Sequence, residues 1–311
     1  MFSSTFYQAL SEAGKRMYME KLYEYDFLPQ GETYFVNNIT GSATNDGLTW
    51  GTAFDEVSTA ITAVIALQAT QTSGDNIRNK IIIAGTSTAY AGLTELADYT
   101  DYIGTGTSPL GNGGGIPRIG SDTAAEDGFL HADGTNRGCN FYNLQFQCGT
   151  AKSCFSIGNL YRSEFHNVAF IVNGVAASAT TGFTAAKLSG CVFDNIHIGT
   201  SSNVEPTIGF DVTGTHFHHC KITNSEISGL TAGFRVATGT TSGYGSILKN
   251  NFIGSHYGTC LICVDDNAST GQIMYCGNFL SGTATGTLYN NHAARWIGNY
   301  TQNGFSDVTN S

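Results

Sequence analysis

A six-residue pattern of hydrophobic and polar positions recurs along the middle and end of the chain. Most copies start with a hydrophobic residue, have an Asn two positions later, and place hydrophobic residues one and three positions after that centre. The copies are FYNLQF from Phe141, FHNVAF from Phe165, FDNIHI from Phe193, FHHCKI from Phe217, LKNNFI from Leu248, MYCGNF from Met274 and LYNNHA from Leu288. The first six begin 24 to 31 residues apart, which is typical of a repeated structural unit with loops of variable length.

The pattern changes parity in its middle, and this change predicts a bend. Side chains alternate between the two faces of a β-strand, so Phe165 and Val168 cannot both point inward from one straight strand. Two short strands that meet at a sharp turn allow both to point inward, and Asn tolerates the left-handed backbone of such a turn. The residues predicted to stack at this bend, with amides linking one coil to the next, are Asn143, Asn167, Asn195 and Asn250.

A second set of segments follows the same interval and supplies another strand to each unit. These segments are CFSIG from Cys154, GFTAA from Gly182, GFDVTG from Gly209, GFRVATG from Gly233 and CLICVD from Cys260. Units with at least two strands each are predicted to stack as a parallel β-helix over residues 79–300. The Asn bend and its flanking hydrophobic stacks resemble the pectate-lyase-like superfamily. The resemblance covers Tyr34 to Tyr300 and implies an all-β, right-handed, single-stranded parallel β-helix.

Residues 31–78 precede the repeats and predict a strand, a loop and a capping helix. A hydrophobic strand from Tyr34 leads through a Gly/Asn/Asp loop containing DGLTW into a stretch of helical periodicity that ends near Gln68. Thr52 or Asp55 can cap this helix. The apolar residues that fall mainly on one face of it are Phe54, Val57, Ile61, Val64, Ile65 and Leu67. We expect this face to close the first coil of the β-helix, and residues 301–311 to form a C-terminal tail.

Residues 1–30 have a different character and predict an amphipathic helical arm. Apolar residues, among them Phe6, Leu10, Met17 and Leu22, recur at three- and four-residue steps with charged residues between them, and Pro29 ends the pattern. The arm can pack on its own domain, dock onto another protein or be disordered, and we favour docking. A short helical arm before a β-helix resembles the attachment segment of phage spike and decoration proteins.

Composition narrows the class of protein. Hydrophobic residues make up 41% of the 311 residues, charged residues only 12%, and Gly occurs 39 times, which favours a globular, turn-rich β protein. The net charge is −10 and Lys and Arg form no run, so nucleic acid is not an expected partner. No secretory signal or membrane-spanning stretch is visible, so we expect cytoplasmic synthesis and no membrane insertion.

The eight cysteines do not predict a disulfide framework or a metal site. Cys260 and Cys263 form one CxxC, but no second CxxC or suitably spaced His pair accompanies it. We interpret the cysteines as small core residues and expect neither a metal nor a cofactor.

The outward positions of the pattern form a candidate glycan-contact surface. It comprises Tyr142, His166, Asp194, His218 and Tyr275. Further aromatic residues expected outside are Tyr289, Phe252 and Trp296, and they suit a glycan-binding groove or a subunit interface equally well. His197, His216 and His219 lie near His166 and His218 of this column, and two or three of these imidazoles could converge on a metal. We favour the interpretation that the histidines are polar residues of a solvated or inter-subunit face.

The acidic residues predict no catalytic site with a known motif. Superfamily members that hydrolyse uronans share NxD, DD, GHG and RxK motifs. Here only a DD is present, at Asp265 and Asp266, and we interpret it as a turn. A glycanase needs two carboxylates at about 5 to 10 Å. The only pairs that the repeat can supply are Glu164 with Asp194 and Asp211 with Glu226.

Three functional hypotheses follow. The first is a non-enzymatic virion protein of a tailed phage: a homotrimeric spike, fibre or capsid decoration, made in the host cytoplasm, docked through residues 1–30 and contacting host polysaccharide. The second is a polysaccharide-degrading tailspike, either a glycoside hydrolase or a lyase. The third, a secreted adhesin, is disfavoured because no signal is visible. We favour the first.

Overall fold

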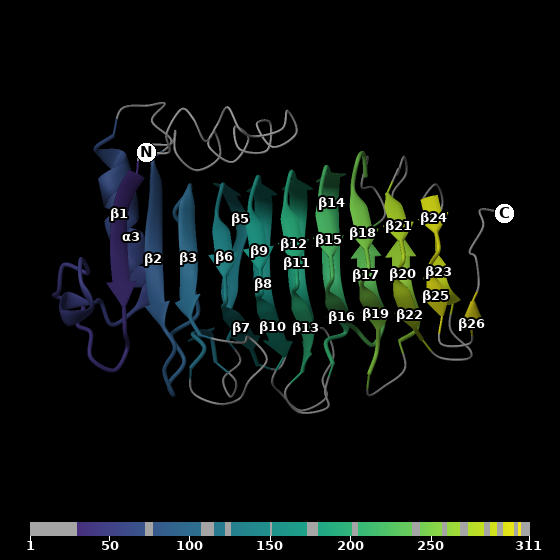
Figure 1. The fold of residues 1–311 in the computed structure, drawn as a ribbon, viewed down its shortest axis with the longest axis horizontal. Coiled ribbons are helices and arrows are strands. Elements are labelled where there is room, and N and C mark those ends of the chain that lie inside the picture. The colour runs from purple at the N-terminus through teal and green to yellow at the C-terminus, as the bar shows by residue number, and fades with distance from the viewer. Residues whose placement is uncertain are drawn as a thin grey trace, which may run out of the picture.

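The chain winds into a parallel β-helix whose coils stack along one axis (Figure 1). The computed structural model describes residues 30–71, 77–106, 115–121, 126–149, 151–172, 180–200, 205–237, 243–256, 260–267, 273–282, 287–290, 295–301 and 304–305. The predicted N-terminal arm, with Phe6, Leu10, Met17 and Leu22, lies outside the described residues.

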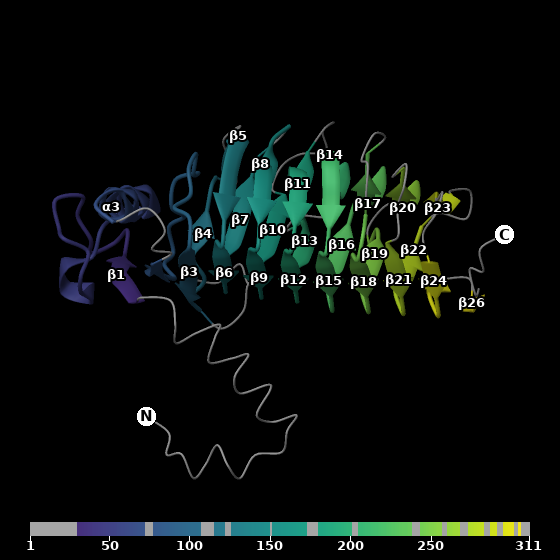
Figure 2. The ribbon, with the colours of Figure 1, turned by 90° about the horizontal axis from the view of Figure 1, so that it is seen from above.

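The strands form three sheets, and from β3 (Thr100–Thr105) onwards the chain contributes in turn to sheets A, B and C (Figure 2). Sheet A contains β1 (Gln30–Val36), β2 (Arg78–Ala84), β3 (Thr100–Thr105), β6 (Asn140–Tyr142), β9 (Glu164–His166), β12 (Val192–Asp194), β15 (Lys221–Thr223), β18 (Ile247–Lys249), β21 (Met274–Cys276) and β24 (Arg295–Ile297). Sheet B contains β4 (Arg118–Ile119), β7 (Gln145–Cys148), β10 (Ala169–Val172), β13 (His197–Thr200), β16 (Glu226–Ser228), β19 (Phe252–Gly254), β22 (Phe279–Ser281), β25 (Tyr300–Thr301) and β26 (Gly304–Phe305). Sheet C contains β5 (Phe129–Arg137), β8 (Ser153–Tyr161), β11 (Thr181–Ser189), β14 (Ile208–His218), β17 (Ala232–Val236), β20 (Ile262–Asp266) and β23 (Thr287–Asn290).

Neighbouring coils pair in parallel, which confirms the predicted fold class. The segment around Phe141 pairs in parallel with the segment around Phe165, and that segment pairs in parallel with the one around Phe193. Within the described ranges the one antiparallel pair is the short hairpin of β25 and β26 at the C-terminal end. Strand β1 is the first strand of sheet A, paired with β2, so the β-sheet begins before the repeated pattern does.

The parity change of the sequence pattern lies at a turn between sheets A and B, which we call the first bend. Its residues are Asn143, Asn167, Asn195, Asn224, Asn250, Gly277 and Gly298, all with positive φ. The five asparagines have φ of 52° to 56°. The side chain of Asn167 donates to Asn143 Oδ1 at 2.6 Å and that of Asn195 donates to Asn167 Oδ1 at 3.1 Å. The structure therefore stacks the four asparagines named from the sequence at one turn.

A second left-handed turn, the second bend, joins sheet C to sheet A. Its residues are Tyr99, Gly138, Arg162, Gly190, His219 and Gly245, with φ of 50° to 68°. Each of the first five residues donates its backbone N–H to the carbonyl oxygen of the residue just before the next bend residue. For example, Arg162 N donates to Ser189 O at 2.9 Å. Each coil thus has two turns with the same backbone requirement.

This duplication corrects the predicted alignment of three copies. Phe193 pairs with Ile222 and not with Phe217, so FHHCKI spans the second bend at His219, and the first bend of that coil is Asn224. Leu248 pairs with Tyr275, so the turn in MYCGNF lies at Gly277 and not at Cys276. Leu288, Tyr289 and Asn290, which begin LYNNHA, lie in β23 of sheet C. At His219 of the second bend, as at Asn143, Asn167 and Asn195 of the first, an apolar residue and an outward residue precede the left-handed residue and an apolar residue follows it, so a local pattern cannot distinguish these bends.

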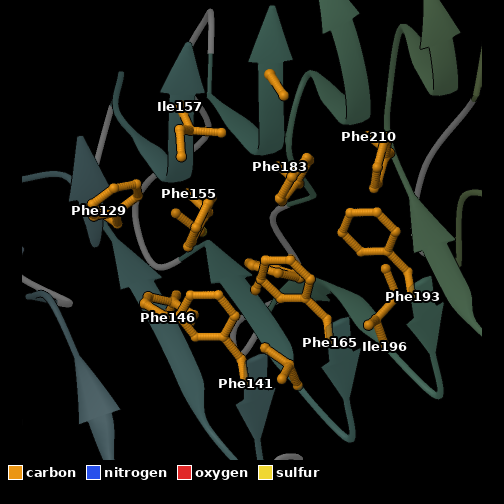
Figure 3. Packing of buried hydrophobic residues seen from close by; sticks show 14 of the residues in the cluster. Phe129, Phe141, Phe146, Phe155, Ile157, Phe165, Phe183, Phe193, Ile196 and Phe210 are labelled. Atoms are coloured by element: carbon orange, nitrogen blue, oxygen red, sulfur yellow. The ribbon is translucent and has the colours of Figure 1, made fainter. Parts of the chain in front are cut away.

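Aromatic rings fill the interior of the middle coils (Figure 3). Phe141, Phe165 and Phe193 stack in sheet A with centroids 4.5 and 4.8 Å apart. From sheet C, Phe155 and Phe183 stack at 5.3 Å and meet the sheet A rings edge-on. All five side chains are fully buried, and offset and edge-to-face contacts of this kind add to the burial of apolar area.

The later coils bury amides in the position that directly follows the first bend. Leu144, Val168 and Ile196 occupy this position in the middle coils; Ser225, Asn251, Asn278 and Asn299 occupy it afterwards. Asn251 Nδ2 donates to Asn278 Oδ1 at 3.0 Å, and Asn278 Nδ2 donates to Asn299 Oδ1 at 2.9 Å. Each of the three amides also donates to a backbone carbonyl of the preceding coil. These asparagines form a buried ladder that satisfies its own polar groups.

Helix α3 (Val57–Ala69) lies at the N-terminal end of the stack, against β1 and β2 (Figure 2). Val57, Ala60, Ile61 and Val64 are its buried residues. Its N-cap is Glu56, which corrects the predicted caps Thr52 and Asp55. Thr52 ends the short 3₁₀ helix η1 (Trp50–Thr52), and the bridge between Phe54 and Val36 keeps the chain extended up to the helix start. In the part of the chain that the structure describes, no helix has the length and apolar character needed to span a membrane.

Candidate functional site

Three members of the predicted glycan-contact surface are neighbours on the outer face of sheet A. Tyr142 pairs with His166, and His166 pairs with Asp194. The Tyr142 and His166 rings stack with centroids 5.4 Å apart and planes at 6°. The next positions of this row are Thr223 and Lys249, so the row becomes less aromatic along the stack.

The other two members lie elsewhere, which corrects the prediction. Tyr275 is fully buried, because it pairs with Leu248 in the inward row, and its hydroxyl lies 3.2 Å from Asp266 Oδ2. His218 ends β14 in sheet C, paired with Ser189. Trp296, also expected outside, is only 9% exposed and stacks on Tyr275.

The first predicted carboxylate pair is not brought together. Glu164 pairs in register with Val192, and Asp194 pairs with His166, so the two acids are offset along the strands. Glu164 Oε2 lies 2.9 Å from His166 Nε2, and this hydrogen bond lowers the pKa of Glu164 and raises that of His166. Asp194 accepts bonds from the side chains of Thr223 and Asn224 at 2.7 and 2.8 Å.

The second predicted pair is divided between two sheets. Asp211 lies in β14 of sheet C, is 4% exposed, and accepts a two-pronged bond from Arg235 at 2.8 and 2.6 Å. Glu226 lies in β16 of sheet B with partners of its own. Asp211 is therefore a structural ion pair of sheet C. Asp266 is also buried, so the DD dipeptide is part of strand β20 and not of an exposed turn.

Glu226 belongs to a surface pocket that the sequence did not reveal, which we call the acid–imidazole pocket. It has a volume of about 240 Å³. It is lined by His197, Gly199, Thr200, Glu205, Glu226, Ser228 and His256. Strands β13 and β16 supply one wall, and Glu205 and His256, which lie outside these strands, supply the rest.

Two imidazoles flank the carboxylate of Glu226. Its Oε1 lies 3.2 Å from His197 Nδ1 and 2.9 Å from His256 Nε2. Burial favours the neutral carboxyl, but the contact with His197 and the charges of both imidazoles outweigh it, so the pKa of Glu226 is lowered. Glu226 is thus held as a carboxylate that can accept hydrogen bonds.

Glu205 forms the inner side of the pocket. It is 2% exposed; its Oε1 accepts from the backbone N–H of His256 at 2.6 Å and its Oε2 accepts from Ser255 Oγ. His256 therefore contacts Glu205 through its backbone and Glu226 through its ring. One residue positions two carboxylates in the same pocket.

An aromatic row continues from this pocket along the outer face of sheet B. Register places His197, Glu226, Phe252, Phe279 and Tyr300 side by side in successive coils. The Phe252 and Phe279 rings stack at 5.9 Å, and Phe252 also stacks on His256 at 4.1 Å. Phe279 and Tyr300 are 40% and 44% exposed. We call these five residues the sheet B row.

The sequence pattern does indicate the sheet B row, but only when the repeat is aligned correctly. If the repeat is aligned on Asn224 in place of His219, Glu226 falls between His197 and Phe252, as the register shows. Glu205 and His256 gave no comparable signal, because they are 51 residues apart and meet only in the folded chain.

The described residues hold no group of three or more His, Cys, Asp or Glu side chains arranged for a metal ion. The eight cysteines are free thiols, seven of them buried. Cys260 and Cys263 are buried side chains of the β-helix interior.

Comparison with known proteins gives a likeness in fold. No family model matches the chain, and no curated protein matches it. A crystal structure of deglycosylated pectin methylesterase from Aspergillus niger is similar with a TM-score of 0.48 and 15% identity, covering 88% of each chain. A rhamnogalacturonan lyase is similar with a TM-score of 0.47 and 12% identity, covering 87% of this chain and 74% of that one.

Proposed function

We propose that this protein binds a carbohydrate chain along the outer face of sheet B, as a structural component of a tailed-phage particle. The observation that carries the binding proposal is the sheet B row, in which an acid–imidazole pocket and three aromatic side chains follow one another in register.

The chemistry of the row suits a sugar polymer. Aromatic rings present an apolar face to the apolar face of a pyranose, and carboxylates and imidazoles bond to its hydroxyl groups. Neighbouring strands are about 4.8 Å apart, so Phe252, Phe279 and Tyr300 offer contacts at close intervals to a chain that runs along the helix axis. Glu226, with its lowered pKa, is a hydrogen-bond acceptor for hydroxyls at neutral pH.

The phage part of the proposal comes from the sequence. Residues 1–30 have the pattern of an amphipathic helix, and the arrangement of an arm before a β-helix resembles phage spike and decoration proteins. We propose that Phe6, Leu10, Met17 and Leu22 dock onto another virion protein and that the β-helix associates as a homotrimer in the particle.

Binding is tested with a double variant, Phe252→Ala with Phe279→Ala, against an array of bacterial surface polysaccharides. Loss of two stacking contacts should weaken binding of a captured glycan by about tenfold or more. Ile297→Ala is the matched control, because it removes a 52% exposed hydrophobic side chain from sheet A. If the double variant instead loses its oligomeric state and keeps glycan affinity, the row is a subunit interface and the binding proposal is wrong.

Docking is tested by deleting residues 1–29, which ends just before β1. The truncated chain should keep its β-sheet circular dichroism and thermal unfolding, since α3 and β1 remain, but should no longer join the particle. Incorporation of the truncated chain at the normal level would refute docking through the arm.

A polysaccharide-degrading function is the second candidate, and the two carboxylates of the acid–imidazole pocket favour it. Glu226, kept ionised, suits a base or nucleophile, and Glu205, which is 2% exposed, is the second carboxyl group that lines the pocket. Reducing-end release from a bound glycan, abolished by Glu226→Gln but not by Glu164→Gln, would establish this function in place of the structural one.

A further inference from the structure

The second bend alternates large side chains with glycine from one coil to the next. Tyr99 is followed by Gly138, Arg162 by Gly190, and His219 by Gly245. Each large side chain lies over the glycine that follows it. A Cβ built on Gly138 would meet the Tyr99 ring at 2.8 Å, and one built on Gly245 would meet the His219 ring at 2.6 Å.

The three large residues adopt a backbone that disfavours them. Tyr99, Arg162 and His219 have φ of 50° to 52°, whereas the intervening coils use glycine for the same turn. A side chain in this left-handed region costs free energy that glycine avoids, and strained residues of this kind concentrate at functional sites. The strain points to a role for the side chains of Tyr99 and Arg162.

Those two side chains line a second surface pocket, which we call the arginine–tyrosine pocket. It has a volume of about 350 Å³. Its lining residues are Tyr99, Arg137, Gly138, Tyr161, Arg162 and Ser189. Arg137 Cζ lies 5.7 Å from the centroid of the Tyr161 ring, so the guanidinium is held over an aromatic face.

Both guanidinium groups are open to a ligand. Arg137 and Arg162 are exposed, and in the described part of the chain no carboxylate forms an ion pair with either. The acid beside the pocket is Asp98, whose Oδ1 accepts from the backbone N–H of Arg137 at 2.9 Å and from Asn136 Nδ2 at 3.1 Å. On a chain with a net charge of −10, two arginines beside two tyrosines, without an ion-pair partner among the described residues, form a local cationic site.

We propose that the arginine–tyrosine pocket binds an acidic sugar unit of a polyanionic glycan. A carboxylate or sulfate group lies between Arg137 and Arg162, where planar guanidinium groups can bond it through two N–H donors each. The sugar ring packs on Tyr99 or Tyr161. His219 repeats the position of Arg162 two coils further, about 9.6 Å away, so a longer chain follows the second bend. This site lies between sheets C and A and does not rest on the sheet B row.

The decisive variant is Arg162→Gly, measured by calorimetry with heparin and polygalacturonate as acidic probes and dextran as a neutral probe. The wild-type chain should bind at least one acidic glycan and not dextran. Arg162→Gly should weaken that binding about tenfold or more, because a charge-assisted bond is lost. Its melting temperature should stay equal or rise, because glycine relieves the left-handed strain. Replacing an arginine with only a structural role would not give weaker glycan binding together with an equal or higher melting temperature.

The matched control is Lys249→Gln, which removes one exposed positive charge from sheet A and should change affinity less than about twofold, as expected for a distant, screened charge. Wild-type affinity in Arg162→Gly, or an equal loss in Lys249→Gln, would overturn the proposal. Inorganic sulfate that binds as tightly as the glycan would show an adventitious anion site only, and the proposal would fail. The double variant of Phe252 and Phe279 should bind acidic glycan with wild-type affinity. The two proposals are therefore tested by different variants, and either can fail without the other.

Discussion

The middle and later coils of the β-helix share one backbone path and fill it by different means. Between Phe141 and Phe210 the interior is a lattice of phenylalanine rings, and the position after the first bend is Leu, Val or Ile (Figure 3). From Asn251 onwards the same position is a buried asparagine, linked to the next by hydrogen bonds of 2.9 to 3.0 Å. Coil geometry therefore does not dictate the chemistry of the interior.

The phenylalanine interior and the asparagine ladder should respond differently to substitutions. Apolar contacts are individually weak and numerous, so a small truncation in a middle coil removes only some of them and the surroundings relax partly around the gap. Each amide of the ladder serves several partners, and removing one leaves buried donors and acceptors without bonds. We expect a substitution that interrupts the ladder to destabilise the later coils more than the loss of some apolar contacts destabilises the middle coils.

The largest expected effect is that of Asn278→Leu. Asn278 accepts from the backbone and side chain of Asn251 and donates to Leu248 O, at 3.0 Å in each case. Removing the amide breaks these three bonds and the one to Asn299 Oδ1. A buried group left without a partner costs about 1 to 3 kcal/mol, so the free energy of unfolding should fall by about 4 kcal/mol or more. Urea denaturation measures this change. Asn250→Gly, at an exposed turn that glycine accepts, is the control and should cost less than about 1 kcal/mol. Equal losses in the two variants would mean that the ladder is not a hydrogen-bonded unit.

The reciprocal change, Val168→Asn, should have a smaller effect. It places an amide between Leu144 and Ile196, which offer it no side-chain partner. By analogy with Asn251, which donates to Ile222 O, we expect the new amide to bond to a backbone carbonyl of the preceding coil. We expect a loss of about 2 to 3 kcal/mol, measured in the same denaturation series. Val168→Ala is the control for lost volume. If Val168→Asn is more stable than Val168→Ala, the middle coils accept a ladder as readily as the later ones, and the contrast between the regions disappears.

The smallest expected effect concerns the outside of the middle coils, where Glu164 and His166 form a pair that the later coils replace with other residues. The pKa of Glu164 is lowered, so its contribution is present above its unfolded value of about 4.3 and is lost as pH falls through the folded value. The pKa of His166 is raised, so its contribution is present below about 6.5 and is lost as pH rises through the folded value. The two side chains are 40% and 34% exposed, so the pair should stabilise the fold by less than about 1 kcal/mol.

Proton NMR titration of His166 tests this pair. The pKa of His166 should fall in Glu164→Gln and should be unaffected by Glu226→Gln, which disturbs the other acid–histidine contact. An unchanged titration of His166 in Glu164→Gln would show that Glu164 does not bond to it in solution.

The fold could be predicted because its signals are local. Alternation of apolar residues and a left-handed Asn between them define two strands and a turn within six residues, and repetition of this unit predicts stacked coils. The site was only partly predictable. Glu226 and His197 were both singled out from the sequence, but the alignment on His219 separated them, and nothing local connects Glu205 with His256.

The repeated coil, the inward residues of the middle coils and the asparagines of the first bend follow from the sequence, because side-chain parity and backbone preference depend on adjacent residues. Which of the two similar bends a given copy occupies is fixed by packing between coils, since the loops between strands vary in length and hydrogen bonds to the neighbouring coil set the register. That register buried Tyr275, moved His218 to sheet C and assembled the sheet B row. It also brought Tyr99, Arg137 and Arg162 to one pocket from three consecutive coils.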